Sequence, residues 1–401
     1  MKRILLFILA LLASLLFLVG CVFVGVNLSA KRIVNQQIAE ALAPVDSTLT
    51  VRVGGVRVHP LRKNIVIKRI KMNWDKEALG ASVGSLTVGL DQPIRMKDIT
   101  FGYTIEPLEL APRLGNRPCT WVSLSLDSLR VSPMDWQTLL KSEKPEILID
   151  SVFVYAQEVN VLRDLRFKSD TVYPTPQDAL LAIPVPLVIH GIRAVIPTVN
   201  VKIATTNINE GGIVLRHIRA NIGNVTNRRN AQMRVIAQGH LGDKAPLSMR
   251  LTFKNDTART FITKMKVDAV PMSLFNTFSY PLVGISVDGK VDSIRADYTG
   301  NTSVVKGSFM MAYHDLSAKV DKQADIPYTI ISKNAGAINF AVDAFIPKAN
   351  PKTVSNKPIA YQVEWTYNPH QLYPVNLLGP VFDGIKKTLL PGLYIHKRVK
   401  K

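Results

Sequence analysis

The sequence predicts a mostly β fold that follows a single N-terminal membrane segment. Two observations carry this prediction: an uncharged apolar run near the start, and a long series of segments in which apolar and polar residues alternate. Alternation with a period of two residues is typical of strands that bury one face and expose the other. With 401 residues, 47% of them hydrophobic, the chain can bury a sizeable core.

The apolar run extends from Ile4 to Val26 and follows Lys2 and Arg3. A helix of this length spans the hydrocarbon core of a bilayer, which is about 30 Å thick. The apolar core of a cleavable signal peptide has only about 7–15 residues. We therefore expect residues 1–29 to form an uncleaved transmembrane signal anchor, with the rest of the chain exported.

A bacterial lipobox is an alternative interpretation of the same run. Leu18-Val19-Gly20-Cys21 matches that motif, in which the cysteine receives the lipid. The apolar run continues past Cys21 as far as Val26, and this length favours the transmembrane segment. Both interpretations tether an exported body to a membrane.

Residues 30–43 are expected to form a short amphipathic helix. Val34, Ile38, Ala41 and Leu42 fall on one face at helical spacing, and Pro44 ends the segment. Such a helix can cap a β-structure or lie on a membrane surface, and we favour the cap. The β-rich body then extends from residue 44 to residue 401.

From residue 48 the period changes from 3.6 residues to two and persists through most of the body. Leu49, Val51 and Val53 alternate with polar residues, and Gly54-Gly55 interrupts the pattern before it resumes. A long series of such strands has one apolar face that needs a cover. Two packed sheets, a barrel or an open elongated groove would each provide one. We find no composition shift that divides the body into domains.

Four parts of the body depart from the strand pattern. The polar and proline-rich residues 163–186 predict a loop or insertion. Ser132-Pro133 predicts the start of a short helix, and Pro271–Tyr280 predicts a helical turn. Residues 380–391 predict a C-terminal helix between two prolines.

The charge of the chain favours an anionic partner. It contains 50 Lys and Arg against 30 Asp and Glu, a formal net charge of +20. Anionic lipid surfaces, acidic glycans and nucleic acids all attract such a protein. The two cysteines provide no disulfide framework.

No pattern in the sequence predicts an active site. The seven histidines lack the spacing of metal ligands. Gly80-Ala81-Ser82-Val83-Gly84 matches a nucleophile elbow, but strand-like residues follow where that elbow requires a helix, so we interpret it as a turn. We expect no enzymatic activity, no metal and no cofactor.

The layout resembles the AsmA-like proteins of the diderm bacterial envelope, a family related to TamB. Lys31–Met72 is similar to the opening of that family, and the Gly-x-x-x-x-x-Tyr-x-Asp-Leu phrase at Gly307–Leu316 is similar to its C-terminal strands. Asp383–Leu389 resembles the helix that closes many such chains. These motifs are structural, so they transfer no catalytic residue.

The resemblance implies an elongated, curled antiparallel sheet, or β-groove, that holds phospholipid and moves it between envelope membranes for outer-membrane maintenance. It implies a single-pass inner-membrane protein with a periplasmic body, membrane phospholipid and envelope proteins as partners, and no nucleic acid. The alternative is a structural or adhesive β-sandwich lipoprotein that binds protein or glycan. In that case the groove candidates would form a dry core. These candidates are Val51, Val53, Ile65, Ile67, Leu86, Val88, Leu124, Leu126, Leu247, Leu251, Phe309, Met311 and Tyr313.

Overall fold

The computed structural model describes residues 49–74, 76, 78–89, 91–115, 119–135, 145–164, 166, 172–204, 210–283, 285–320, 347–351 and 356–389. The predicted membrane anchor at 1–29, Cys21 and the helix expected at 30–43 lie outside these residues. None of the helices within these ranges is both long and apolar enough to cross a bilayer.

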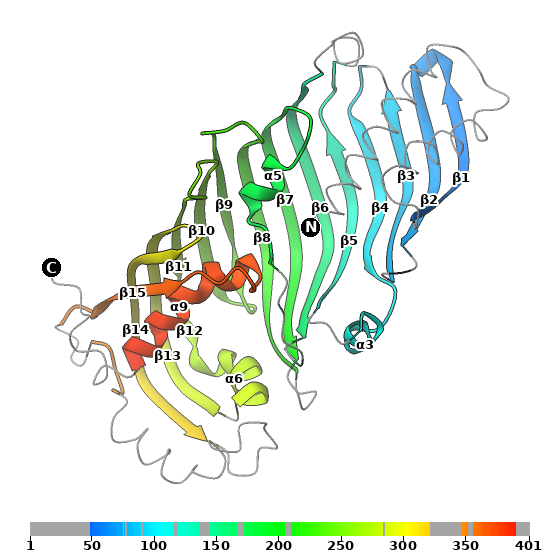
Figure 1. The fold of residues 1–401 in the computed structure, drawn as a ribbon. Coiled ribbons are helices and arrows are strands. Elements are labelled where there is room, and N and C mark those ends of the chain that lie inside the picture. Colours follow the sequence, from blue (N-terminus) through cyan, green and yellow to red (C-terminus); the bar gives the residue numbers. More distant parts are fainter. Residues whose placement is uncertain are drawn as a thin grey trace.

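One curled sheet contains all fifteen strands of the described residues (Figure 1). β12 (Val270–Pro271) pairs with β13 beside the main path. The path itself runs through β1 (Leu49–His59), β2 (Asn64–Trp74), β3 (Leu79–Gly89), β4 (Ile94–Tyr103), β5 (Thr120–Val131), β6 (Ile147–Asp164), β7 (Leu187–Ala204), β8 (Glu210–Thr226), β9 (Gln232–Leu241), β10 (Ala245–Lys254), β11 (Phe261–Val267), β13 (Ile285–Gly300), β14 (Val304–Val320) and β15 (Ala360–Thr366). The predicted β-rich curled sheet is confirmed, and its strands form one sheet rather than the two of a sandwich.

The pairs along this path are antiparallel with one exception, because β6 and β7 run parallel. A parallel pair needs a connection that returns to the starting end of the sheet. The segment after β6 provides it, and its described part contains helix α5 (Pro176–Leu181). The loop predicted at 163–186 is thus corrected in two respects: β6 continues through Asp164, and the segment includes a helix.

A seam of irregular backbone crosses the first strands at one level. Arg69 of β2 and Asp98 of β4 have left-handed φ angles of 56° and 53°. Each lies beside a glycine of a neighbouring strand. A Cβ atom at Gly54 would lie 2.6 Å from Arg69 Nε, and one at Gly84 would lie 2.8 Å from Asp98 Cβ. Larger residues at the two glycines would therefore collide with these side chains.

On each strand, the seam shifts by one residue the alternation that turns apolar side chains to the inner face. On β2, Ile65 and Ile67 are buried on one side of the seam, and Ile70 and Met72 on the other. Since neighbouring strands shift together, one face stays apolar along its whole length. The seam comprises the positions that the strand pairing skips at this level: Gly54, Arg69, Gly84, Asp98, Asp127, Gln157, Pro197 and His217.

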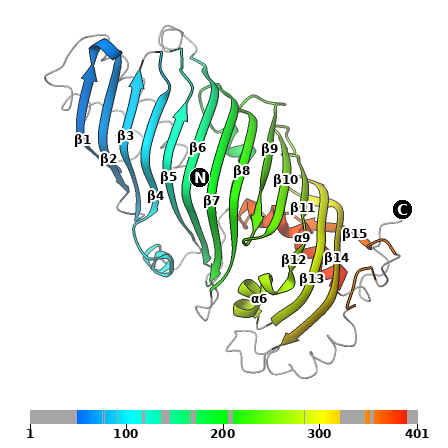
Figure 2. The same ribbon diagram turned by 180° about the vertical axis from the view of Figure 1, so that it is seen from behind.

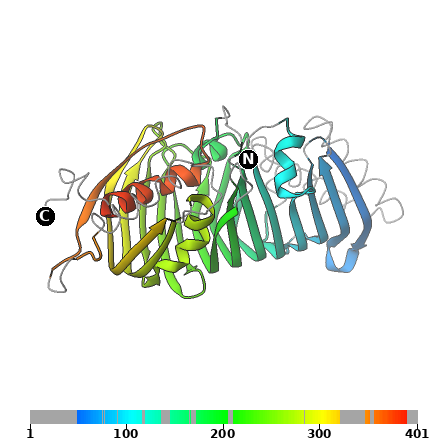
Figure 3. The same ribbon diagram turned by 90° about the horizontal axis from the view of Figure 1, so that it is seen from below.

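Helix α9 (Tyr373–Leu389) covers the apolar inner face of the last strands, as the view from below shows (Figure 3). Its two glycines allow close contact: a Cβ atom at Gly379 would lie 2.3 Å from the Trp365 ring, and one at Gly384 2.1 Å from the Phe309 ring. The Tyr298 hydroxyl donates a hydrogen bond to the Leu377 carbonyl. These contacts bury the C-terminal core between helix and sheet.

The predicted start of this helix was wrong. It begins at Tyr373, and Pro380 lies inside it rather than before it. The reason is packing: Tyr373, Leu377 and Val381 are buried on one face that continues across the proline. This burial outweighs the backbone hydrogen bond that the proline removes.

Helices also form beside β12. The helical turn predicted at Pro271–Tyr280 is confirmed and is longer than expected, because it contains η4 (Met272–Phe275) and α6 (Asn276–Val283). α6 contacts β8 and β13 near one end of the sheet, and it is visible there from behind as well (Figure 2).

Two local predictions were wrong because the residues involved belong to a strand of the sheet or form hydrogen bonds with one. Gly80–Gly84 lies inside β3 rather than in a turn, and Ser82 Oγ lies 2.8 Å from Thr100 Oγ1 of β4. Residues 132–135 are not helical, and residues 136–144 lie outside the described part of the chain. Ser132 Oγ accepts hydrogen bonds from the backbone of β6, at 3.1 Å from Asp150 N and 3.2 Å from Ser151 N.

Candidate functional site

Most of the predicted groove residues are buried in two clusters on the inner face of the sheet. The N-terminal cluster contains Val53, Ile65, Ile67, Leu86 and Val88, with Val51 packed against it. The C-terminal cluster contains Leu251, Phe309, Met311 and Tyr313, with Leu247 packed against it. Leu126 is also buried, whereas Leu124 is half-buried. The structure therefore brings these residues to one face but places most of them in packed core.

Between the buried residues of the two clusters, the inner face carries apolar residues that are half-buried or, at Val201, exposed. They form two rows that cross the strands from β4 to β8, in direct register. The first row is Phe101, Leu124, Val159, Val199 and Leu215. The second row is Val122, Val161, Val201 and Ile213. We call these nine residues the apolar strip.

The two packed clusters mark the ends of the apolar strip: Phe101 packs against the N-terminal cluster, and Ile213 and Leu215 pack against the C-terminal cluster. At the ends of β4 and β5, Tyr103 packs against a small cluster around Leu110 of helix α3 (Leu110–Arg113), which follows η3 (Pro107–Glu109). Beyond β8, Thr277 of α6 donates a hydrogen bond to the Gly212 carbonyl at 2.8 Å. Within the described ranges, the helices that pack extensively on the sheet contact β8, β13, β14 and β15. The middle of the strip therefore has no described helix packed extensively on it.

The strip contains no titratable side chain, but a cation lies beside it. Arg163 lies two residues along β6 from Val161, so it points to the same face. Its guanidinium donates hydrogen bonds to Thr120 Oγ1 at 3.0 Å and to Tyr173 Oη at 3.3 Å. It also lies 5.6 Å from the centre of the Tyr173 ring. The site thus combines an apolar surface with one adjacent positive charge.

Sequence reasoning missed the central valines of the strip. Val159, Val161, Val199 and Val201 carry the alternation that predicts strands. Their sequence separation conceals that they are neighbours. They meet only because β6 and β7 pair in parallel, with Val159 opposite Val199 and Val161 opposite Val201. The signal that could have found them is the matching pair of Val-Asn-Val segments at 159–161 and 199–201.

Comparison with known proteins gives no further guide to the strip. No family model, curated protein or solved structure matches the chain. The shape and chemistry of the inner face are therefore the basis for a functional proposal.

The connection between β6 and β7 is fixed at its start by an ion pair. Asp164 is fully buried, and Arg166 binds both of its carboxylate oxygens, with Nε at 3.0 and 3.1 Å and Nη2 at 2.7 Å. Arg166 Nη2 also donates to the Leu108 carbonyl at 2.6 Å. The hydrogen bonds with Asp164 raise the pKa of Arg166. This pair links the crossover to η3.

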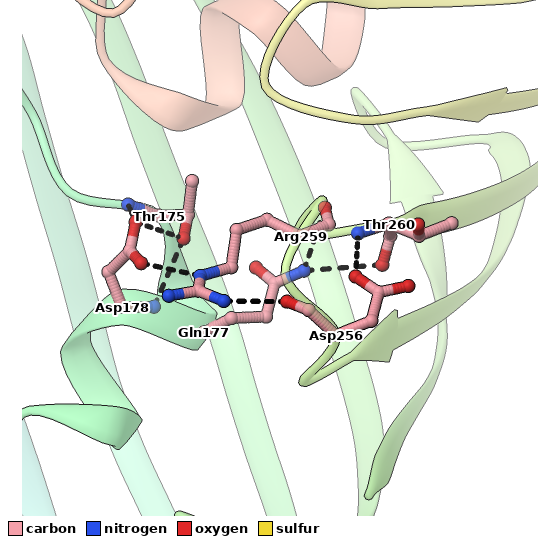
Figure 4. Close-up of polar contacts among 6 residues, drawn as sticks. All are labelled: Thr175, Gln177, Asp178, Asp256, Arg259 and Thr260. Carbon is pink, nitrogen blue, oxygen red and sulfur yellow. Dashed lines mark hydrogen bonds and ion pairs between the residues drawn. The ribbon is translucent and has the colours of Figure 1, made fainter. Parts of the chain in front are cut away.

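Helix α5 of the same connection is held against the turn between β10 and β11 (Figure 4). Arg259 Nε donates to Asp178 Oδ1 at 2.6 Å. Gln177, which is fully buried, donates to the carbonyls of Arg259 and Thr260 at 3.2 and 3.3 Å. Thr175 caps the helix: its Oγ1 accepts from Asp178 N at 3.0 Å. The connection is thus attached to the rest of the fold at Arg166 and again at helix α5.

Acid is expected to loosen this second attachment. Burial raises the pKa of Asp178, but hydrogen bonds from Arg259 and Thr175 outweigh it and hold the pKa below its usual range. A carboxyl with a lowered folded-state pKa stabilises the fold above its unfolded pKa of about 3.9 and loses that contribution as the pH falls further. We expect Asp178→Asn to cost about 1 kcal/mol at neutral pH, as other helix-capping changes do.

The measurement is the free energy of urea unfolding at a series of pH values. The difference between the wild type and Asp178→Asn should shrink as the pH falls below about 4. Asp297→Asn, at an exposed ion pair with Lys264, is the control and should cost less at neutral pH. A difference for Asp178→Asn that stays constant across this range would contradict the prediction.

Metal and thiol chemistry find no support in the described residues. No group of three His, Cys, Asp or Glu side chains there is arranged to hold a metal ion. Cys119 is buried, and burial together with the charge of Asp164 raises its pKa to about 11. This thiol therefore stays protonated at neutral pH and is a poor nucleophile.

Proposed function

We propose that this chain is a non-enzymatic lipid-binding protein that holds a phospholipid acyl chain on the apolar strip. The observation that carries the proposal is the strip itself: two apolar rows in register, whose ends pack against the two clusters and whose central residues are only partly buried. Apolar surface of this kind is stabilised when a ligand removes it from water.

The length of the strip suits an acyl chain. Each row crosses neighbouring strands about 4.8 Å apart, so the row of five residues spans about 19 Å. One leaflet of a bilayer holds its acyl chains in about 15 Å, half of the hydrocarbon core. A chain that lies across the strands would therefore fit between the two clusters that mark the ends of the strip.

The cation beside the strip favours an amphiphile over a purely apolar ligand. Arg163 lies on the inner face next to Val161, and its guanidinium bonds only neutral side chains, Thr120 and Tyr173, in the contacts described above. An arginine in this position can pair with a phosphate oxygen while the acyl chain contacts the valines. The proposed ligand is thus a phospholipid.

The wider setting of the proposal follows from the sequence. With a transmembrane segment at 1–29, the body would lie in the periplasm and transfer phospholipid for outer-membrane maintenance, as the resemblance to AsmA-like proteins implies. A single curled sheet with an apolar inner face supports this setting. The alternative, an adhesive protein built of closed sandwiches, loses support because the described strands form one sheet.

A matched pair of variants tests the proposal. Val201 and Val195 lie on the same strand, β7, and each is 37% exposed, but Val201 belongs to the strip and Val195 lies on the outer face. We expect Val201→Glu to reduce bound phospholipid at least tenfold, because the carboxylate would place a charge under the acyl chain and would compete with the lipid phosphate for Arg163 on the neighbouring strand. Val195→Glu should retain the lipid.

The measurement is native mass spectrometry of the full chain, purified in mild detergent, together with uptake of a fluorescent phospholipid. Circular dichroism of both variants shows whether either has lost the sheet. A wild-type chain that neither co-purifies with phospholipid nor takes it up would overturn the proposal. Equal lipid loss in the two folded variants would remove the strip as its site.

A further inference from the structure

A basic hollow lies on the outer face of the sheet, at the end where β1 joins β2 and β3 joins β4. Its volume is about 700 Å³, within the usual range of ligand pockets. Hydrogen bonds hold its two turns together: Gln92 Nε2 donates to the Arg62 carbonyl at 2.8 Å, and Asn64 Nδ2 donates to Gln92 Oε1 at 3.1 Å. The hollow is therefore present before any ligand arrives.

Positive charge dominates this hollow. Its lining includes the four cations Arg62, Lys63, Arg95 and Lys97 against one carboxylate, Asp91. Both cations of β4 are exposed and alternate with residues that are buried on the inner face. None of the four takes part in an ion pair with another described residue. Their charge is thus available to an external anion.

Strand register places further like charges together on this face. Arg95 lies directly opposite Arg130 of β5, and Arg52 of β1 lies opposite Lys71 of β2. Like charges in such cross-strand pairs destabilise a sheet. An anionic partner on the outer face would relieve that repulsion.

One apolar side chain projects beside the hollow. Leu61 lies in the turn η1 (Pro60–Arg62) and is 101% exposed, so it makes no packing contact that would explain its presence there. A leucine flanked by basic residues is typical of segments that enter the interface of an anionic bilayer. Its position decides between the possible anionic partners, because a polyanion such as nucleic acid offers no apolar layer to receive it.

We propose that this hollow and Leu61 form a docking site for the surface of an anionic phospholipid bilayer. The four cations contact lipid phosphates, and Leu61 enters the interface between them. His59 is the one aromatic side chain in the lining, with no Phe, Tyr or Trp beside it, so the row of stacking rings that supports single-stranded nucleic-acid binding is missing there. The site lies on the outer face and does not depend on the proposed function of the apolar strip.

The test follows the environment of residue 61 in the full chain. A polarity-sensitive fluorophore is attached at Leu61→Cys in a Cys21→Ser background, where Cys119 is buried and protected from labelling. The chain is held in nanodiscs of phosphatidylcholine and titrated with vesicles. We expect a blue shift with vesicles of phosphatidylcholine and phosphatidylglycerol, and none with phosphatidylcholine alone.

Charge variants make the test specific. Each basic residue near an anionic bilayer contributes about a fivefold factor, so Arg95→Gln/Lys97→Gln should require about 25-fold more vesicle lipid. Lys264→Gln/Lys306→Gln removes the same charge from exposed, ion-paired positions of other strands and is the matched control. Val201→Glu should leave the shift unchanged, which separates this site from the apolar strip.

Four results would overturn the proposal: no shift with either vesicle, an equal shift with both, equal behaviour of the two double variants, or reversal by inorganic phosphate but not by chloride at the same ionic strength. The last result would show a site for small phosphate-containing anions rather than a docking surface for a bilayer.

Discussion

Replacing Gly384 with valine is expected to destabilise the protein by about 3 kcal/mol, the upper part of the usual range for overpacking. Gly384 is buried in α9, and a Cβ atom there would lie 2.1 Å from the Phe309 ring. That ring is itself fully buried in the C-terminal core, so it cannot move aside freely. Helix α9 would have to lift from β14 and β15, exposing the cluster that it covers.

The measurement is the free energy of urea unfolding, with Lys386→Val as the matched control. Lys386 lies in the same turn of α9 but is exposed, so this variant carries the same β-branched cost without the collision. Similar losses in the two variants would show that α9 does not pack on Phe309 as described.

Removing the guanidinium of Arg166 is expected to have the largest effect, a loss of about 3–5 kcal/mol. Arg166→Met would leave the Asp164 carboxylate fully buried without its cation. It would also remove the hydrogen bond to the Leu108 carbonyl, which connects the crossover to η3. Thermal unfolding of the variant should therefore begin at a clearly lower temperature.

A second substitution should recover much of this loss. Asp164→Asn/Arg166→Met keeps an oxygen that can accept the Arg166 backbone N–H, which donates at 3.0 Å in the wild type, but it buries no charge. Removing both partners of a buried pair costs less than removing one. If the double variant were less stable than Arg166→Met alone, the buried charge would not be the source of the loss.

The strands could be predicted from the sequence because their signal is local. Alternation on a single strand such as β2 already reports which residues are buried, including the change of phase between Ile67 and Ile70. The cause of that change was not visible. It depends on Arg69 and Gly54 meeting across two strands, a contact between residues that no local pattern connects.

The apolar strip could not be predicted for a similar reason. Period-two alternation identifies one apolar face but does not distinguish Ile67, which is packed in a core, from Val201, which is 37% exposed. That difference depends on which elements lie over each part of the sheet. Helix α9 covers the last strands because small residues at two of its positions permit close contact.

The seam constrains how this chain can change in length. A single-residue deletion within one strand would turn the apolar side chains beyond it to the outer face. The apolar side chains of that strand would then point to the opposite face from those of its neighbours, because the shift occurs at the same level from β1 to β8. We therefore expect the fold to accept insertions and deletions at the connections, or within the strands when neighbours change together. The length of each of these strands thus depends on the lengths of its neighbours.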